Sequence, residues 1–313
     1  MSVEAGGKSV VLAAVDIGSN ATKVLVWEIG GDKRPHERLQ KRFALRLEDV
    51  FRVGRIEPSM IARLVETFLE ITEICRRHGA QYVRAAATEA FRSASNAQEV
   101  VAAIALETGI EPKIVSPHEE GRLVAEGVLL DHAECRSDFL ILDIGGGSAQ
   151  TILPDRRSGI HTITLPLGAV RLREKFVRTD PIKLADFEAM CAHAEATAAR
   201  IRIGAGGRRR GSAFGCGGGV RFLHAMCGIL CGTLSQNQPV RADQLEHLCQ
   251  AIWPMPADTV IRHYGIDHER AEIIVPGAVA LLALMKCLKI VELRPSSRGV
   301  RDGLLADFLR NLS

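Results

Sequence analysis

The stretch VVLAAVDIGSNATKVLVWEI, residues 10–29, contains the pattern that decides the fold. An apolar run over 10–15 leads to Asp16 and the small polar turn Gly18-Ser19-Asn20, and a second apolar run follows over 23–29. Two apolar runs joined by a short polar turn predict a β-hairpin. Such a hairpin places a carboxylate at the end of a buried strand, directly before a turn made of small residues.

The same pattern recurs once, far along the chain. Residues 138–143 form an apolar run that ends on Asp143, and Ile144-Gly145-Gly146-Gly147-Ser148 follows, with a further strand expected over 150–153. The two copies, at Asp16 and Asp143, are much farther apart in the sequence than the short repeats of a solenoid. It predicts two similarly built halves. A third glycine-rich turn, Cys216–Gly219, follows a strand expected over 212–215.

The segments around these turns alternate between helical and extended patterns. Apolar residues recur every three to four positions over 58–78, which predicts an amphipathic helix that ends at Gly79. Further strands are expected at 82–86 and 112–115. Further helices are expected at 97–109, 119–130, 168–177, 181–200, 220–232, 241–252, 256–264, 269–288 and 302–312.

Composition supports an α/β protein with two domains. The 313 residues are enough for two cores of ordinary size. Hydrophobic residues make up 47% and charged residues 25%, which is typical of a globular chain. Because aromatic residues are only 4%, the core must consist mainly of Ala, Val, Ile and Leu. That composition favours helices packed on buried parallel strands.

The net charge and the cysteines indicate which classes of protein the chain does not resemble. The net charge is +3, from 40 basic and 37 acidic residues, so neither a bulk nucleic-acid binder nor a membrane-surface binder is indicated. Eight cysteines without a C-x-x-C pair could form disulfides in principle, but this spacing is more typical of reduced core thiols. Residues 1–8 lack the layout of a signal peptide, and the longest apolar run, 273–285, is too short to span a bilayer and contains Pro276. We therefore expect a cytoplasmic protein with no nucleic-acid or membrane partner.

The two Asp-Ile-Gly turns are candidates for phosphate and metal binding. A carboxylate at the end of a buried strand has a fixed direction, and the glycines after it expose backbone N–H groups to an anion. Asp16 and Asp143 would then face a cation or its waters. One such turn alone is more often only a polar hairpin turn. Two copies, with a third glycine turn at 216–219, favour the phosphate interpretation.

Seven motifs resemble those of the exopolyphosphatase/guanosine pentaphosphate phosphohydrolase (Ppx/GppA) family. They occur in the family's order from about residue 11 to 308, and the length is similar to that of the family's short two-domain form. The matching segments are 15–20, 87–92, 116–123, 143–148, 165–172, 269–277 and 298–305. Any one of these could occur by chance, whereas seven in order identify the chain as a member.

The resemblance implies a fold and its division into domains. The expected fold is the actin-like, ribonuclease H-like ATPase superfold: two α/β domains, each a mixed five-stranded sheet with flanking helices, and an active site in the interdomain cleft. The N-terminal domain would span 1–125 and be completed by a helix at about 302–313, and the C-terminal domain would span 126–301. The family further implies a homodimer.

The resemblance also implies roles for particular residues. Glu120 matches the catalytic base that orients the attacking water, although Glu119 and Glu120 would also favour a helix N-terminus electrostatically. Arg92 would be a positive clamp on the substrate, with Arg122 and Arg171 as weaker candidates. Asp16 and Asp143 would hold Mg²⁺. The phosphates would be cradled by Ser19, Asn20, Gly145, Gly146, Gly147, Ser148, Gly217 and Gly218. The implied substrates are inorganic polyphosphate and guanosine penta- or tetraphosphate.

Two positions depart from the family pattern. Gln150 stands where the family has a metal-binding Glu, and it would be a weak, uncharged ligand. Gly219 stands where the family has Thr, so one hydroxyl donor is lost. Weak metal binding, an altered substrate or loss of catalysis would each fit these changes. Arg208–Arg210 would either bind a polyanion or lie in a solvated loop.

Three functions therefore stay open at this point. The first is a magnesium-dependent hydrolase that releases the terminal phosphate of polyphosphate or guanosine pentaphosphate. The second is a catalytically weakened protein that binds these ligands, as Gln150 and Gly219 suggest. The third is a kinase or ATPase of the same superfold, because fold alone does not separate these activities.

Overall fold

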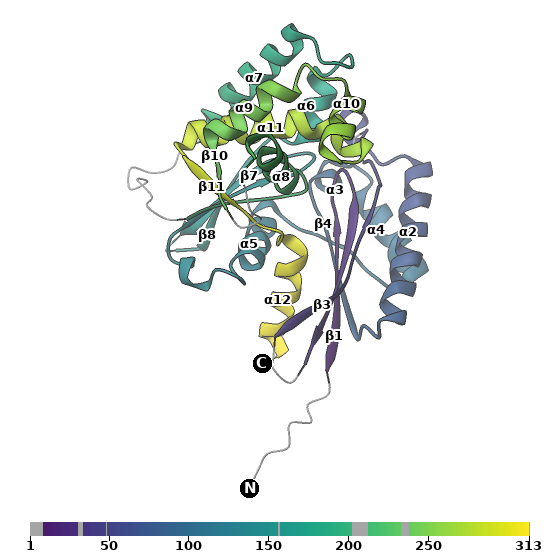
Figure 1. Cartoon of the computed structure of the whole chain (residues 1–313). Helices are drawn as coiled ribbons and strands as arrows, with labels where there is room; N and C mark the ends of the chain where they lie inside the picture. Colours follow the sequence, from purple (N-terminus) through teal and green to yellow (C-terminus); the bar gives the residue numbers. More distant parts are fainter. Residues whose placement is uncertain are drawn as a thin grey trace. The chain divides into compact units, whose positions relative to one another are not determined.

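The computed structural model describes residues 9–30, 34–47, 49–155, 157–201, 212–232 and 238–312 (Figure 1). The chain packs into two compact units. Unit 1 is Met1–Gly127 with Val300–Ser313, and unit 2 is Val128–Gly299. The arginines 208–210 lie outside the described residues.

Unit 1 is built on a mixed five-stranded sheet, as expected. Its strand order is β3-β2-β1-β4-β5. The first three strands are antiparallel neighbours, and β4 and β5 run parallel to β1. The β1–β2 hairpin predicted from the opening stretch is confirmed. The strands are β1 (Val10–Ile17), β2 (Thr22–Ile29), β3 (Pro35–Phe43), β4 (Tyr82–Ala87) and β5 (Lys113–Ile114).

Helices cover both faces of this sheet. Val11, Ala13 and Val15 of β1 join a core with α2 (Pro58–Arg77) and α4 (Ala97–Thr108) on one face. The alternate residues of β1 are also buried, and α12 (Val300–Leu312) packs against β1, β2 and β4. A strand covered on both sides must be apolar at nearly every position, which explains the continuous run over 10–15. The remaining helices are α1 (Val50–Val53), α3 (Glu89–Ser93) and α5 (Pro117–Val128).

Unit 2 contains six strands, so the expectation of five was wrong for this half. The order is β10-β11-β9-β6-β7-β8. The additional strand, β10 (Val240–Arg241), pairs antiparallel with β11 (Glu292–Pro295) at the edge of the sheet. Two residues are too few to carry an alternating pattern, and the pairing exists only because the fold brings β11 alongside. The other strands are β6 (Phe139–Ile144), β7 (Ala149–Asp155), β8 (Gly159–Leu165) and β9 (Ser212–Cys216).

One long helix organises the helical layer of unit 2. Helix α11 (His268–Leu288) packs against α6, α7, α8, α9 and α10 and contacts β6. Among the described residues it is the helix that is long and apolar enough to cross a bilayer, and 67% of its most apolar window is buried in the protein. The expectation that this segment is too short was therefore wrong, because the helix extends beyond the apolar run. The others are α6 (Ala169–Phe176), α7 (Leu184–Ala198), α8 (Val220–Cys231), α9 (Ala242–Ile252) and α10 (Ala257–Tyr264).

The cysteines are free thiols, as the sequence predicted. Burial raises the pKa of Cys75 to about 11 and that of Cys227 and Cys249 to about 12. Only the thiolate reacts, so these three side chains are inert near neutral pH. They belong to the packing of the two cores rather than to a site.

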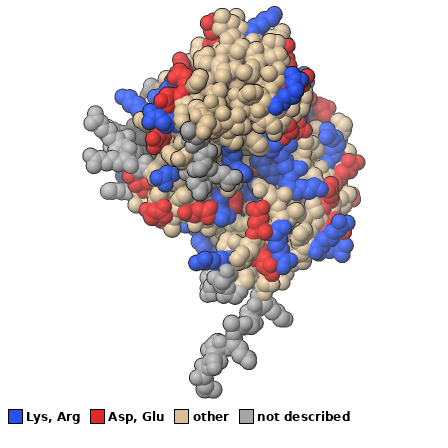
Figure 2. Space-filling model, in the orientation of Figure 1, with Lys and Arg blue, Asp and Glu red and all other residues tan. Residues whose placement is uncertain are grey.

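Charges of both signs are interspersed on the face of the molecule that Figure 2 shows. Exposed side chains form ion pairs within each unit, such as Arg38 with Glu28 at 2.7 Å and Arg298 with Asp131 at 2.8 Å. Exposed pairs of this kind contribute little to stability.

Candidate functional site

The two Asp-Ile-Gly turns share one geometry. In unit 1 the Gly18 N–H donates to the carbonyl of Ala21 at 3.1 Å, and in unit 2 the Gly145 N–H donates to the carbonyl of Ser148 at 2.9 Å. Each turn joins two neighbouring antiparallel strands of its own sheet. The repeat seen in the sequence is therefore a repeat of structure.

This geometry separates the amides that donate within the turn from those that have no acceptor in the described residues. The N–H of Gly145 donates within its own turn, and its role in the predicted phosphate cradle stays a prediction. A row of free N–H groups is what an anion requires. Within the described ranges, no acceptor receives the backbone N–H groups of Ser19, Asn20, Gly146, Gly147 and Ser148.

Backbone N–H groups at the start of α6 donate hydrogen bonds to the carbonyl oxygens of the glycine turn in unit 2. The N–H groups of Ala169 and Val170 donate to the carbonyls of Gly145 and Gly146, both at 2.9 Å. Arg171 Nε donates to the carbonyl of Gly147 at 2.8 Å. A Cβ at Gly168 would overlap the carbonyl group of Gly146, so this close approach requires glycine. Arg171, a weak candidate for the substrate clamp, thus binds the turn itself.

Asp143 stands at the head of a row of polar residues on three neighbouring strands. Asp143 on β6 lies opposite Gln150 on β7, which lies opposite Thr164 on β8. Residues opposite each other project from the same face of a sheet. Gln150 is 1% exposed. Both polar atoms of Gln150, and the hydroxyl of Thr164, have no hydrogen-bond partner in the part of the chain that the structure describes.

The third glycine turn lies against the same carboxylate. Gly217 follows β9 and has a φ of +96°, and a Cβ there would lie 2.8 Å from Asp143 Oδ1 and overlap the carbonyl oxygen of Ile144. Gly219 is the N-cap of α8, whose first-turn N–H groups open toward the turn. A Cβ at Gly218 or Gly219 would meet nothing within 4 Å. Only Gly217 is required by geometry.

Asp16 has a different electrostatic environment. Its partner across the hairpin is Lys23, which in turn lies opposite Arg42 on β3. The Lys23 ammonium is 4.0 Å from Asp16 Oδ2. Lys23 occupies the position in unit 1 that Gln150 occupies in unit 2. The row in unit 1 is therefore basic, whereas the row in unit 2 is neutral apart from its aspartate.

These residues fit a magnesium ion that is held largely by its substrate. Among the described residues there is no group of three or more His, Cys, Asp or Glu side chains able to form a complete metal cage. Magnesium sites commonly use one or two carboxylates together with substrate phosphates and waters. Asp143 offers one charged oxygen ligand, and its cross-strand neighbour Gln150 offers a neutral one, with Thr164 one strand further on. Asp16 fits less well because Lys23 already compensates its charge.

Glu120 lies in the first turn of α5, where a cap sets its position. Ser116 Oγ accepts a hydrogen bond from the Glu119 N–H at 3.1 Å, and the Ser116 carbonyl accepts one from the Glu120 N–H at 2.9 Å. Ser116 is therefore the N-cap, and Pro117 occupies the first helical position, where its missing N–H is harmless. Glu120 is 8% exposed, so its carboxylate is held by protein rather than by bulk water.

Arg92 is the ion-pair partner of Glu120. Arg92 Nη1 lies 2.8 Å from Glu120 Oε2, and Nη2 lies 2.8 Å from Glu89 Oε2. The guanidinium also donates to the carbonyl of Val115, just before α5, at 2.8 Å. In the structure Arg92 thus orients the predicted base. Its role as a clamp on substrate stays a prediction.

Three residues of this constellation were not among the candidates from sequence. Glu89 shares Arg92, Ser116 caps α5, and Gly168 admits the glycine turn. Local signals existed for two of them. Glu89 and Arg92 have the i,i+3 spacing of a helical ion pair, and Ser-Pro before two glutamates is a helix start. Gly168 had none, since its contact is with a distant turn.

We expect the Gln150→Met variant to be more stable than the wild type by about 1 kcal/mol. A buried polar group without a partner costs about 1–3 kcal/mol, and an apolar side chain of similar shape removes that cost. The free energy of unfolding from urea titration measures the effect. Gln98→Met, at an exposed position on α4, is the matched control and should shift it by no more than about 0.5 kcal/mol. A destabilised Gln150→Met would mean that the carboxamide has a partner in solution.

Comparison with known proteins identifies a family for the chain. The model of the Ppx/GppA phosphatase family matches residues 32–312. The chain is 27% identical over 300 residues to exopolyphosphatase 1 of Mycobacterium bovis, covering 94% of this chain and 87% of that protein. It is 26% identical to the guanosine-5'-triphosphate,3'-diphosphate pyrophosphatase of Pseudoalteromonas atlantica, covering 96% of this chain and 59% of that protein.

Solved structures show the same fold. The Ppx/GppA family member of Aquifex aeolicus superimposes with a TM-score of 0.81 at 21% identity, over 98% of this chain and 99% of that one. The exopolyphosphatase of Cytophaga hutchinsonii gives a TM-score of 0.83 at 21% identity, over 96% and 98%. At this identity the likeness establishes the architecture alone.

Proposed function

On the premise that this chain belongs to the Ppx/GppA phosphatase family, we propose that it is a magnesium-dependent phosphoanhydride hydrolase. Its substrates would be inorganic polyphosphate or guanosine pentaphosphate, from which it releases the terminal phosphate. Support comes from relatives named exopolyphosphatase and guanosine-5'-triphosphate,3'-diphosphate pyrophosphatase.

One observation carries the proposal: the carboxylate of Glu120 is buried, lies in the capped first turn of α5 and is paired with Arg92 at 2.8 Å. In the proposed reaction Glu120 accepts a proton from a water molecule as the water oxygen bonds to the terminal phosphorus. The bond from that phosphorus to the bridging oxygen breaks, and the shortened chain leaves with the electron pair. Arg92 holds the carboxylate in one direction throughout.

The remaining groups would bind the phosphates. The open amides of Gly146, Gly147 and Ser148 offer hydrogen bonds to phosphoryl oxygens in unit 2, and those of Ser19 and Asn20 do so in unit 1. Magnesium, when bound, would neutralise charge on the phosphoryl oxygens. Asp143 would be its main protein ligand, with Asp16 and the neutral oxygen of Gln150 as weaker ones.

A second candidate is a ligand-binding protein with little or no turnover. The neutral Gln150 favours it, because the site then contributes one carboxylate fewer to the metal. Binding of polyphosphate or guanosine pentaphosphate without release of orthophosphate would establish this alternative.

One experiment separates the two. Orthophosphate release from polyphosphate and from guanosine pentaphosphate is measured in parallel across a magnesium titration, for the wild type and for Gln150→Glu. A hydrolase predicts release by the wild type, and the added carboxylate should lower the magnesium concentration for half-maximal rate by about tenfold. Gln98→Glu on α4 is the surface control. Release only after Gln150→Glu would favour the binding protein, and turnover of adenosine triphosphate alone would contradict both.

A further inference from the structure

We propose that Asp307, on the C-terminal helix α12, is a positioning residue for Glu120. Its carboxylate fixes α5 relative to β4, and these two elements deliver the two members of the Glu120–Arg92 pair. The inference rests on the proposed function, since it assigns Asp307 a role in presenting the base.

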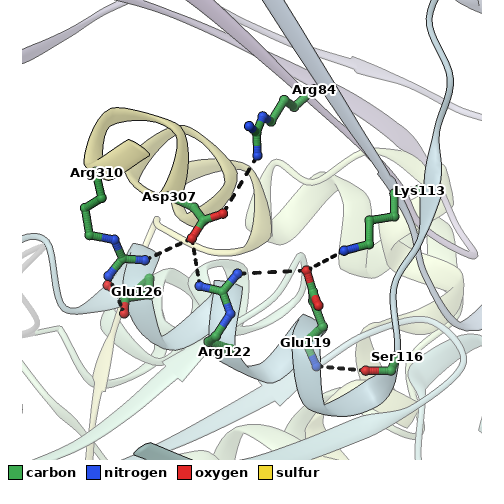
Figure 3. A network of polar contacts seen from close by, with 8 residues as sticks. All are labelled: Arg84, Lys113, Ser116, Glu119, Arg122, Glu126, Asp307 and Arg310. Atoms are coloured by element: carbon green, nitrogen blue, oxygen red, sulfur yellow. Dashed lines mark hydrogen bonds and ion pairs between the residues drawn. The ribbon is translucent and has the colours of Figure 1, made fainter. Parts of the chain in front are cut away.

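Three arginines converge on this one carboxylate (Figure 3). Asp307 Oδ1 lies 2.9 Å from Arg122 Nη1 and 3.1 Å from Arg310 Nη2, and Oδ2 lies 3.8 Å from Arg84 Nη1. Burial raises the pKa of Asp307, but the hydrogen bonds and charges of Arg122 and Arg310 outweigh it and leave that pKa below its ordinary value. The carboxylate is therefore ionised throughout the neutral range.

The arginines connect the elements that matter for the base. Arg122 is on α5, two residues after Glu120. Arg84 is on β4, which leads directly into α3 and Arg92. Asp307 thus connects α5, which carries Glu120, with β4, which leads to Arg92. Glu120 and Arg92 form the ion pair at 2.8 Å.

The contact between α5 and α12 leaves little room to absorb a shift. A Cβ at Gly303 would overlap the carbonyl oxygen of Leu123, so the two helix backbones touch there. Arg310 extends the contact by pairing with Glu126 at 2.7 Å. At the other end of α5, Glu119 pairs with Lys113 at 3.0 Å (Figure 3). Because close-packed elements transmit small displacements, a change at Asp307 should reach the first turn of α5.

The test compares Asp307→Asn with Asp307→Glu. We expect Asp307→Asn to lower kcat for phosphate release by about tenfold while KM stays within about twofold, since slight misplacement of a reacting group slows chemistry more than binding. Asp307→Glu, which keeps the charge, should restore most of the rate. Glu73→Gln is the matched control: Glu73 also binds two arginines, which lower its pKa to about 2, but it lies on the exposed face of α2.

Two further measurements separate positioning from general support of the fold. In a Glu120→Gln background, Asp307→Asn should cause no additional loss of rate, whereas a full further loss would overturn the inference. Hydrogen exchange of the peptide spanning residues 116–126 should become faster in Asp307→Asn, and unchanged exchange would also overturn it. If the wild type releases no phosphate, the proposed function fails, while the exchange experiment still decides whether Asp307 holds the start of α5.

Discussion

Replacing Glu120 by glutamine should lower the rate of orthophosphate release by about 10²–10⁴-fold, the usual contribution of a general base. Glutamine keeps the shape of the side chain and a polar group beside Arg92, but it cannot accept a proton from the attacking water. Since the change leaves the phosphate-binding amides untouched, KM should alter by less than about threefold. Steady-state release from polyphosphate at saturating magnesium measures both constants.

The control for this variant is Glu107→Gln, on the exposed surface of α4. It removes the same charge from the same unit without touching the base, and its rate should equal that of the wild type. Equal rates for wild type and Glu120→Gln would remove Glu120 from the role of base. Arg92 would then become the residue to examine as a direct phosphate ligand, because its guanidinium would no longer be explained by orienting the base.

The Gly217→Ala variant should lose both stability and turnover. The native φ of +96° is strained for any residue with a Cβ, which costs about 1–2 kcal/mol. The added carbon would also lie 2.8 Å from Asp143 Oδ1 and overlap the carbonyl of Ile144, and overpacking typically adds about 1–3 kcal/mol. We expect the free energy of unfolding to fall by about 3 kcal/mol. We expect turnover of the remaining folded protein to fall by at least about tenfold, because the carboxylate proposed to hold magnesium is displaced.

Gly232→Ala isolates the backbone-strain part of this effect, without the steric overlap. Gly232 ends α8 with a φ of +74°, and a Cβ there would meet nothing within 4 Å. This variant should therefore lose only about 1 kcal/mol and keep its activity. Unfolding in urea and phosphate release are measured on both proteins. If the two variants behave alike, backbone strain alone accounts for the loss, and the contact between Gly217 and Asp143 has no special role.

The extent of prediction from sequence differs between elements for physical reasons. The β1–β2 hairpin and α2 were predicted because their signals are local: an apolar run with a polar turn, and apolar residues at helical spacing. Strand β3 was missed because it lies at the edge of the sheet and is mostly exposed and charged, so it lacks an apolar run. Strand β10 was missed because two residues become a strand only when β11 lies beside them.

In the candidate site, too, the features with a local sequence signal were predicted and those that depend on packing were not. The sequence predicted the turns at Asp16 and Asp143 and the glutamate at the start of α5. It did not show that the Gly145 amide is already engaged, or that Gln150 is buried without a partner. Those properties depend on peptide orientation and on what packs over the strands, which no local pattern encodes.

By itself the sequence determined the two Asp-Ile-Gly turns, the hairpins that contain them and the helix start that carries Glu120. Each depends on a few consecutive residues whose backbone preferences act locally. Only the tertiary structure decided which groups surround them: Arg92 between Glu89 and Glu120, Gly217 against Asp143, and Asp307 on Arg122, 185 residues away in the chain. These contacts form between segments distant in sequence, so packing of the whole unit sets their distances.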